Sequence, residues 1–289
     1  MTAKLIMPPS GICQRTVIAD DRQEIGYAVS GDRVKQTVML ISGLGQDVTS
    51  WYRLLDCISQ DFRVIIPEHR GVGLSKTVRI SEGSLSIDRM AADIHHVIQK
   101  ECPEGVDCIV GGSMGGFITQ TLYARFPAAA RSLVLASTSV GGGNSYNIPE
   151  RTRAVWRLAL EGDADAMQAS FEASHSTSWL ADNPLLAEEV KYLRFASRPS
   201  AAVWREQFHA VEDFLRRGSP VQKIDVPTEV MHGDLDGVIP FENVEVTMSR
   251  CNDSRLVIAE NAGHAVWIER PELVAESIKS LVARENNLK

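Results

Sequence analysis

One serine lies in a sequence pattern typical of a nucleophile. A short apolar run at residues 108–111 leads directly into Gly111-Gly112-Ser113-Met114-Gly115, and an apolar helical pattern follows. A serine hydroxyl that attacks a carbonyl group must project from a tight turn, and the neighbouring glycines allow the backbone to pack closely there. G-x-S-x-G alone also occurs by chance, but a preceding strand and a following helix make it more specific. Ser113 is therefore the candidate nucleophile.

A base and an acid follow later in the chain, each after a predicted strand. His264 follows the apolar run 256–258, and Asp236 follows the run 229–231, with Asp234 two residues earlier. A histidine can take the serine proton, and a carboxylate can orient the imidazole and stabilise its charged form. Ligand sites of open α/β sheets gather at the carboxyl ends of the strands. We therefore expect Ser113, Asp236 and His264 to meet there.

The elements that would position these residues alternate along the chain. Continuous apolar strands separated by helices predict an α/β fold, with a mostly parallel central sheet of about eight strands and helices on both faces. An antiparallel hairpin is predicted from the runs 15–19 and 25–29. The other predicted strands are 38–42, 64–67, 108–111, 133–136, 229–231 and 256–258, and the predicted helices are 50–59, 87–100, 114–126 and 271–284.

The alternation stops between about residues 140 and 221, where helical patterns fill 150–161, 164–174, 185–196 and 201–216. We interpret residues 141–221, which are rich in aromatic side chains, as a helical cap over a pocket. The cap divides an α/β core into residues 1–140 and 222–289. We expect most cap arginines to be solvated or ion-paired, with one available to an anionic substrate group. They are Arg151, Arg153, Arg157, Arg194, Arg198 and Arg205.

With these residues in place, the chain resembles the capped serine hydrolases of the α/β-hydrolase fold, in the manner of esterases and lactonases, over nearly its whole length. Residues 42–45, Ser-Gly-Leu-Gly, resemble the oxyanion loop of that family. Residues 68–75, Glu-His-Arg-Gly-Val-Gly-Leu-Ser, resemble its D-x-R-G-x-G-x-S segment. Two positions depart from the family pattern, because Ser42 stands where histidine is common and Glu68 stands where aspartate is usual.

The resemblance implies roles for particular residues. Ser113, Asp236 and His264 fall in the family's order of nucleophile, acid and histidine, and the spacing before Pro240 favours Asp236 over Asp234. The implied oxyanion hole consists of the backbone N–H groups of Leu44 and Met114. Candidate pocket residues are Gln46, Trp51 and Phe117.

The implied reaction is two-step acyl transfer to water through an acyl-serine, on a carboxylic ester, lactone or thioester. The expected substrate is a small molecule with apolar surface. No cofactor and no metal is implied, because backbone donors would stabilise the developing charge. Three other functions stay open: a C–C bond hydrolase of a diketone, an acyltransferase, and a ligand receptor on a hydrolase scaffold.

Composition narrows the partners and the compartment. The 289 residues carry 30 basic and 37 acidic side chains, a net charge of −7, so nucleic acid and anionic membranes are not expected partners. The cysteines are odd in number and lack a C-x-x-C spacing, which indicates a reduced intracellular protein. The N-terminal apolar run is too short for a signal peptide. We therefore expect a cytoplasmic enzyme, and the sequence leaves its oligomeric state open, a homo-oligomer included.

Overall fold

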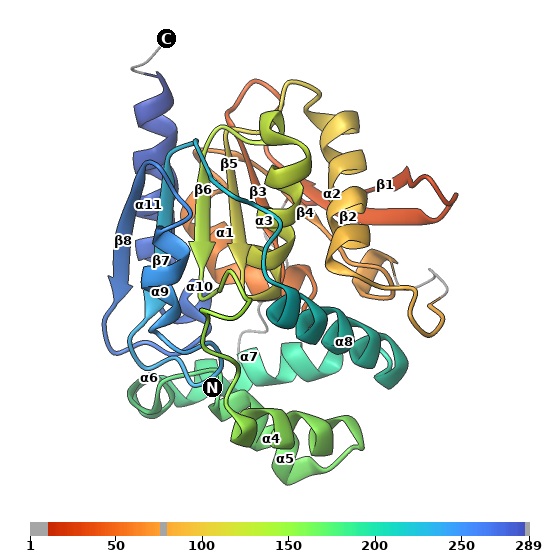
Figure 1. Ribbon diagram of the computed structural model, residues 1–289, viewed down its shortest axis with the longest axis vertical. Helices are drawn as coiled ribbons and strands as arrows, with labels where there is room; N and C mark the ends of the chain where they lie inside the picture. The colour runs from red at the N-terminus through yellow and green to blue at the C-terminus, as the bar shows by residue number, and fades with distance from the viewer. Residues whose placement is uncertain (1–10, 76–79, 287–289) are drawn as a thin grey trace.

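A computed structural model describes residues 11–75 and 80–286, and its centre is a single eight-stranded sheet (Figure 1). The strand order is β1-β2-β4-β3-β5-β6-β7-β8; β2 is antiparallel to both of its neighbours, β1 and β4, and all other neighbouring strands are parallel. The strands are β1 Cys13–Ile18, β2 Glu24–Ser30, β3 Thr37–Ile41, β4 Arg63–Pro67, β5 Cys108–Gly112, β6 Leu133–Ala136, β7 Thr228–Gly233 and β8 Ser254–Ala259. The predicted fold class is confirmed. The N-terminal segment considered as a signal peptide lies at residues 1–10, outside the described residues.

Helices cover both faces of the sheet (Figure 1). The buried residues of α2 and α3 pack on one face, and those of α1, α10 and α11 pack on the other. Strands β3 to β6 are buried along their whole length, which explains their continuous apolar sequences. The helices of the core, outside the cap, are α1 Tyr52–Ile58, α2 Ile87–Glu101, α3 Met114–Arg125, α9 Asn243–Met248, α10 Val266–Glu269 and α11 Pro271–Asn286.

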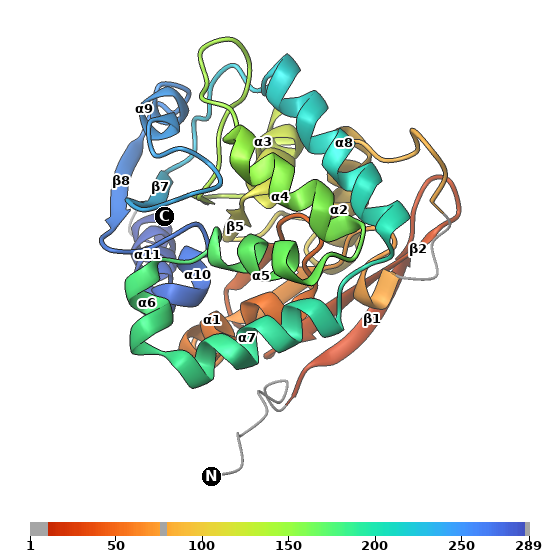
Figure 2. The same cartoon turned by 90° about the horizontal axis from the view of Figure 1, so that it is seen from below.

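Five helices, α4 to α8, fill the stretch between β6 and β7, inside the predicted range 141–221. They cross the carboxyl end of the sheet, as the view from below shows (Figure 2). Their bounds are α4 Glu150–Leu160, α5 Ala164–Glu172, α6 Thr177–Asp182, α7 Pro184–Ala196 and α8 Ala201–Arg217. In the part of the chain that the structure describes, no helix is both long and apolar enough to cross a membrane.

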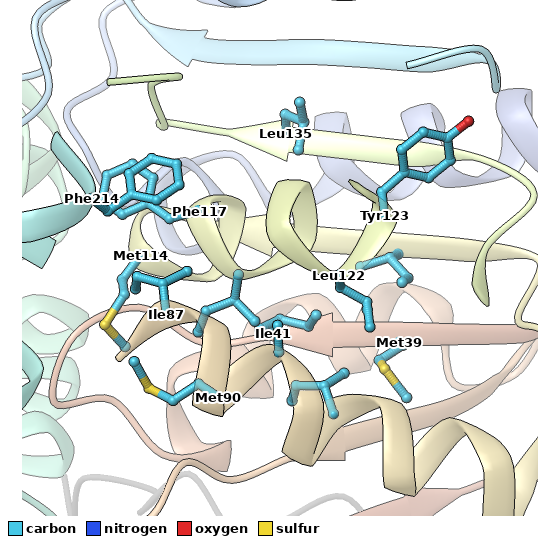
Figure 3. Packing of buried hydrophobic residues seen from close by; sticks show 14 of the residues in the cluster. Met39, Ile41, Ile87, Met90, Met114, Phe117, Leu122, Tyr123, Leu135 and Phe214 are labelled. Carbon is cyan, nitrogen blue, oxygen red and sulfur yellow. The ribbon is translucent and has the colours of Figure 1, made fainter. Parts of the chain in front are cut away.

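Helix α3 is the element that brings the candidate nucleophile to the sheet. Phe117 on α3 stacks against Phe214 on α8, with ring centroids 4.5 Å apart (Figure 3). Almost the whole helix is buried, because it lies between the sheet, α2 and α8. This explains why its sequence has no charged face, and why its buried polar residues make internal hydrogen bonds, Thr119 to the Gly115 carbonyl and Gln120 to the Ser139 carbonyl.

The first turn of α3 lies so close to β3 that only glycine fits at position 115. A Cβ atom at Gly115 would lie 2.0 Å from the carbonyl oxygen of Ile41. We expect Gly115→Ala to lower the free energy of unfolding by about 2 kcal/mol or more, because the backbone of β3 or α3 must move. Chemical denaturation measures the loss. Gly143→Ala is the matched control, since nothing lies within 4 Å of that position, and an equal loss in both variants would contradict the packing argument.

Candidate active site

Ser113 lies in a strained turn between β5 and α3. Its backbone has φ 56° and ψ −120°, a conformation that costs free energy for any residue with a side chain. Three hydrogen bonds fix the turn: the Ser113 N–H donates to the Ala136 carbonyl (2.9 Å), and the Ser113 carbonyl accepts from the Gly116 N–H (2.8 Å) and the Thr138 hydroxyl (2.9 Å). The surrounding structure therefore holds the serine in a position that the local backbone would not favour.

Asp236 and His264 form a direct pair. His264 Nδ1 lies 2.8 Å from Asp236 Oδ2, and the Asp236 side chain is fully buried. The other carboxylate oxygen accepts from the backbone N–H groups of Val238 (2.8 Å) and Ile239 (2.9 Å). Because this carboxylate accepts from Nδ1, the Nε2 atom of His264 is left as the proton acceptor.

His232 provides a second histidine contact to the same carboxylate. Its Nε2 lies 3.1 Å from Asp236 Oδ2 and 2.9 Å from the carbonyl oxygen of Ile239, so Nε2 carries a proton. Burial by itself would raise the pKa of Asp236, but the charge of His264 and the hydrogen bonds from His232 and His264 lower that pKa well below its usual range. Asp236 therefore stays ionised.

The two candidate acids are separated clearly. Asp234 is exposed, and its carboxylate accepts only a 3.3 Å hydrogen bond from the Ala262 N–H among the described residues. The structure thus brings Asp236, and not Asp234, to His264.

Trp267 connects the histidine loop with the serine turn. Its ring centroid lies 6.1 Å from that of His264. A Cβ atom at Gly112, directly before Ser113, would lie 2.9 Å from the Trp267 ring. Within the described residues, Ser113 Oγ makes no hydrogen bond, a geometry common in free hydrolases before substrate tightens the site.

The loop after β3 lies against the serine turn. A Cβ atom at Gly43 would lie 3.3 Å from Ser113 Cβ. The Gln46 side chain accepts from the Gly43 N–H (3.1 Å), and the Gly45 N–H donates to Gln207 Oε1 on α8 (2.8 Å). No acceptor among the described residues takes a hydrogen bond from the N–H of Leu44 or of Met114.

The two departures from the family pattern have clear packing roles. Ser42 Oγ accepts from Trp51 Nε1 (2.8 Å), and the Ser42 carbonyl accepts from His69 Nε2 (2.9 Å). Glu68 accepts from the backbone N–H groups of Val48 (2.8 Å) and Leu74. Burial raises the pKa of Glu68 to about 7. Both residues anchor the loops around the site and make no contact with Asp236 or His264.

The three predicted pocket residues have different positions. Gln46 lines a cavity between the cap and the core. Trp51 is fully buried against Trp267, with ring centroids 5.3 Å apart, and Phe117 is buried against Phe214. These two side chains belong to the core rather than to the described cavities: Trp51, directly before α1, packs on Trp267, and Phe117 packs on Phe214 of α8.

Two adjoining cavities lie between the cap and the core, and Gly45 and Arg194 line both. The narrow one has a volume of about 30 Å³ and is lined by Gln46, His175 and Ala265, among others. The wide one has a volume of about 550 Å³, and its apolar wall includes Leu44, Trp156, Met167, Phe195 and Trp204. The sequence marks Arg194 only as one of six cap arginines, and no motif singles out Arg194 or His175, because only the folded cap brings them to the core.

The comparisons agree with this architecture. A model of the alpha/beta hydrolase fold family matches residues 36–271, so the chain belongs to that family, and the prediction of a hydrolase is confirmed at the level of enzyme class. The chain is 22% identical over 263 residues to 3-oxoadipate enol-lactonase 2 of Acinetobacter baylyi, covering 91% of this chain and 94% of the relative.

Two further relatives show the range of the family. A 2-hydroxy-6-oxo-6-(2'-aminophenyl)hexa-2,4-dienoic acid hydrolase of Metapseudomonas resinovorans is 25% identical over 257 residues, covering 88% of this chain and 86% of the relative. The crystal structure of an esterase from Rhodococcus sp. ECU1013 superposes with a TM-score of 0.79 at 19% identity, covering 93% of this chain and 98% of that one. At this identity the superposition establishes the fold alone.

The lowered pKa of Asp236 predicts a pH-dependent contribution to stability. A carboxylate whose pKa is lower in the folded than in the unfolded state stabilises the fold fully above its unfolded pKa of about 4, and the contribution is lost as pH falls towards the folded pKa. Asp236→Asn should therefore lower the free energy of unfolding at pH 7, and the difference from the unmodified protein should shrink below about pH 4. Denaturant titrations at several pH values test this. Asp234→Asn should show little difference at any pH, and a pH-independent deficit for Asp236→Asn would contradict the assignment.

Proposed function

We propose that the chain is a serine hydrolase that cleaves a carboxylic ester, lactone or thioester through an acyl-Ser113 intermediate. The observation that carries the proposal is the pair of features at the carboxyl end of the sheet: the strained turn at Ser113, and a histidine whose Nδ1 is held by a buried, ionised aspartate. Trp267 lies between them, against both Gly112 and His264. This arrangement matches the requirements of nucleophilic acyl transfer.

In the proposed first step, Ser113 Oγ attacks the substrate carbonyl carbon while His264 Nε2 takes the serine proton. The charge on the carbonyl oxygen is stabilised by the N–H groups of Leu44 and Met114, which have no other acceptor among the described residues. Collapse of the tetrahedral intermediate breaks the bond to the leaving group, which receives the proton from His264. In the second step His264 activates a water molecule, which releases the acid and restores Ser113.

The apolar wall of the wide cavity favours a substrate with substantial apolar surface. The names of the relatives include a lactonase and an esterase, which supports acyl cleavage. The 2-hydroxy-6-oxo-dienoic acid hydrolase keeps a C–C bond hydrolase as the second candidate, because the same three residues would serve it. Because Ser113, Asp236 and His264 would serve both reactions, only analysis of the products distinguishes ester cleavage from C–C bond cleavage.

The proposal predicts that Ser113→Ala lowers kcat/KM for p-nitrophenyl esters of short and medium acids by roughly a thousandfold or more, because the acyl-enzyme cannot form. Release of p-nitrophenol measures this loss. Asp236→Asn should lose far more activity than Asp234→Asn. Ser249→Ala is the matched control, because that hydroxyl is exposed and donates to the Val246 carbonyl. Turnover by Ser113→Ala close to that of the control would exclude Ser113 as the nucleophile.

A second prediction concerns the loop after β3. Gln46 holds the Gly43 N–H with its side chain, and its own N–H donates to the Gly43 carbonyl (3.3 Å), so it fixes the position of the Leu44 N–H. Gln46→Ala should lower kcat by about tenfold and change KM less, because a displaced oxyanion donor weakens the transition state more than the ground state. Steady-state kinetics on one p-nitrophenyl ester test this. A change confined to KM would instead assign Gln46 to substrate binding.

A further inference from the structure

Arg194 on α7 is a cation without an acidic partner on the inner side of the cap. Its guanidinium donates to Ser174 Oγ at 3.1 Å, and no carboxylate of the described residues lies within ion-pair distance. Two other cap arginines are ion-paired, Arg153 with Glu212 and Arg157 with Glu150. Arg194 is the cap arginine that lines both cavities. Burial lowers the pKa of Arg194 to about 10, so it is still charged at neutral pH. Arg194 is half-buried, and a partly desolvated cation without a carboxylate partner is stabilised when an anion joins it.

His175 adds a hydrogen-bond acceptor at the same place. Its Nδ1 lies 2.9 Å from the Phe171 carbonyl oxygen, so Nδ1 carries the proton and Nε2 presents a lone pair. His175 is only 6% exposed, and its Nε2 atom is buried and has no hydrogen-bond partner among the described residues. Burial lowers the pKa of His175 to about 3, so the ring is neutral and does not replace the missing anion.

Both side chains line the narrow cavity directly beside the candidate active site. Gln46 and Ala265 line the same cavity, and these residues flank the oxyanion loop and His264. The Ser174 carbonyl accepts from the Ala265 N–H at 3.0 Å, which fixes this part of the cap to the histidine loop. A group bound by Arg194 would therefore belong to a molecule that also reaches the wide cavity, because Arg194 lines both cavities.

We propose that Arg194 binds a carboxylate group of the substrate, while His175 Nε2 accepts a hydrogen bond from a hydroxyl or a water molecule next to it. Resting on the proposed acyl transfer, this makes the substrate class the monoesters or lactones of acids that carry a second, free carboxylate. The planar guanidinium suits a carboxylate because it can donate two parallel hydrogen bonds. The narrow cavity of about 30 Å³ has room for one such small group, and the wide cavity of about 550 Å³, whose lining mixes apolar and polar side chains, takes the rest of the molecule.

The test compares esters that differ only in a terminal carboxylate. The pairs are ethyl butanoate with monoethyl succinate, ethyl pentanoate with monoethyl glutarate, and ethyl hexanoate with monoethyl adipate, all followed by acid release at constant pH. We expect the unmodified enzyme to prefer the anionic member of at least one pair by tenfold or more in kcat/KM, on the order of one charge-assisted hydrogen bond. No preference in any pair would overturn the proposal.

The variants assign that preference to one side chain. Arg194→Gln should lower kcat/KM for the anionic ester at least about tenfold more than for its neutral counterpart, mainly through KM. Arg194→Lys, which keeps the charge but loses the planar fork, should be intermediate. Arg157→Gln is the matched control, because it removes the same charge from an exposed ion pair of the cap and should leave both rates unchanged. Equal losses on both esters in Arg194→Gln would assign the residue to packing and overturn the proposal.

A binding measurement separates this proposal from the proposed function. Calorimetry of succinate, glutarate and adipate with the Ser113→Ala protein needs no turnover. Dicarboxylate binding to Ser113→Ala that is lost in Ser113→Ala/Arg194→Gln would support the carboxylate site. If the unmodified protein then hydrolysed no ester, that result would contradict the hydrolase proposal and leave the carboxylate site standing. Hydrolysis of neutral esters without dicarboxylate binding and without anionic preference would overturn the site and leave the hydrolase proposal standing.

Discussion

The close approach of α3 to the sheet is the constraint on which the candidate site depends. Gly111 and Gly115 allow it, because any side chain at these positions would clash. A Cβ atom at Gly111 would lie 2.4 Å from Thr119 Oγ1, and one at Gly115 would lie 2.0 Å from the Ile41 carbonyl oxygen. The chain can then reverse sharply at Ser113, whose unfavourable backbone is offset by hydrogen bonds to the neighbouring strand end. The same approach places the free N–H of Met114 beside the loop after β3. One packing requirement thus positions the candidate nucleophile and a candidate oxyanion donor together.

The cap is connected to each loop that carries a candidate catalytic group. Gln207 on α8 accepts from the Gly45 N–H in the loop after β3 (2.8 Å), and Thr152 on α4 donates to the Gly237 carbonyl beside Asp236 (2.9 Å). Glu269, next to the histidine loop, accepts from the Ser176 N–H at the start of α6 (3.0 Å). Because these bonds reach three separate loops, the cap and the active-site end of the sheet act as one structural unit. This connection explains how residues of α5 to α7 come to line a cavity beside His264.

The strands, the long helices and the Asp236–His264 pair follow from local sequence signals, but several features of the site do not. Apolar runs and strand–turn–helix patterns are local, so they identify elements such as β5 and α3 and place their carboxyl ends together. The short helices α6, α9 and α10 escape such patterns because they span too few residues to show a period. Trp51 and Phe117 lie near the site in sequence, yet their helices direct them into the core. Arg194 and His175 depend on how the cap folds over the sheet, which no spacing reveals.

The central claim is that Ser113 is an activated nucleophile, and labelling with a fluorophosphonate tests it most directly. Intact-mass analysis counts the adducts, and peptide mapping locates them. The account predicts one adduct per chain, on the peptide that contains Ser113, and its absence in both Ser113→Ala and the His264→Ala protein, which has lost the base. A protein that remains unlabelled while folded, or an adduct on another residue that persists in Ser113→Ala, would contradict the account.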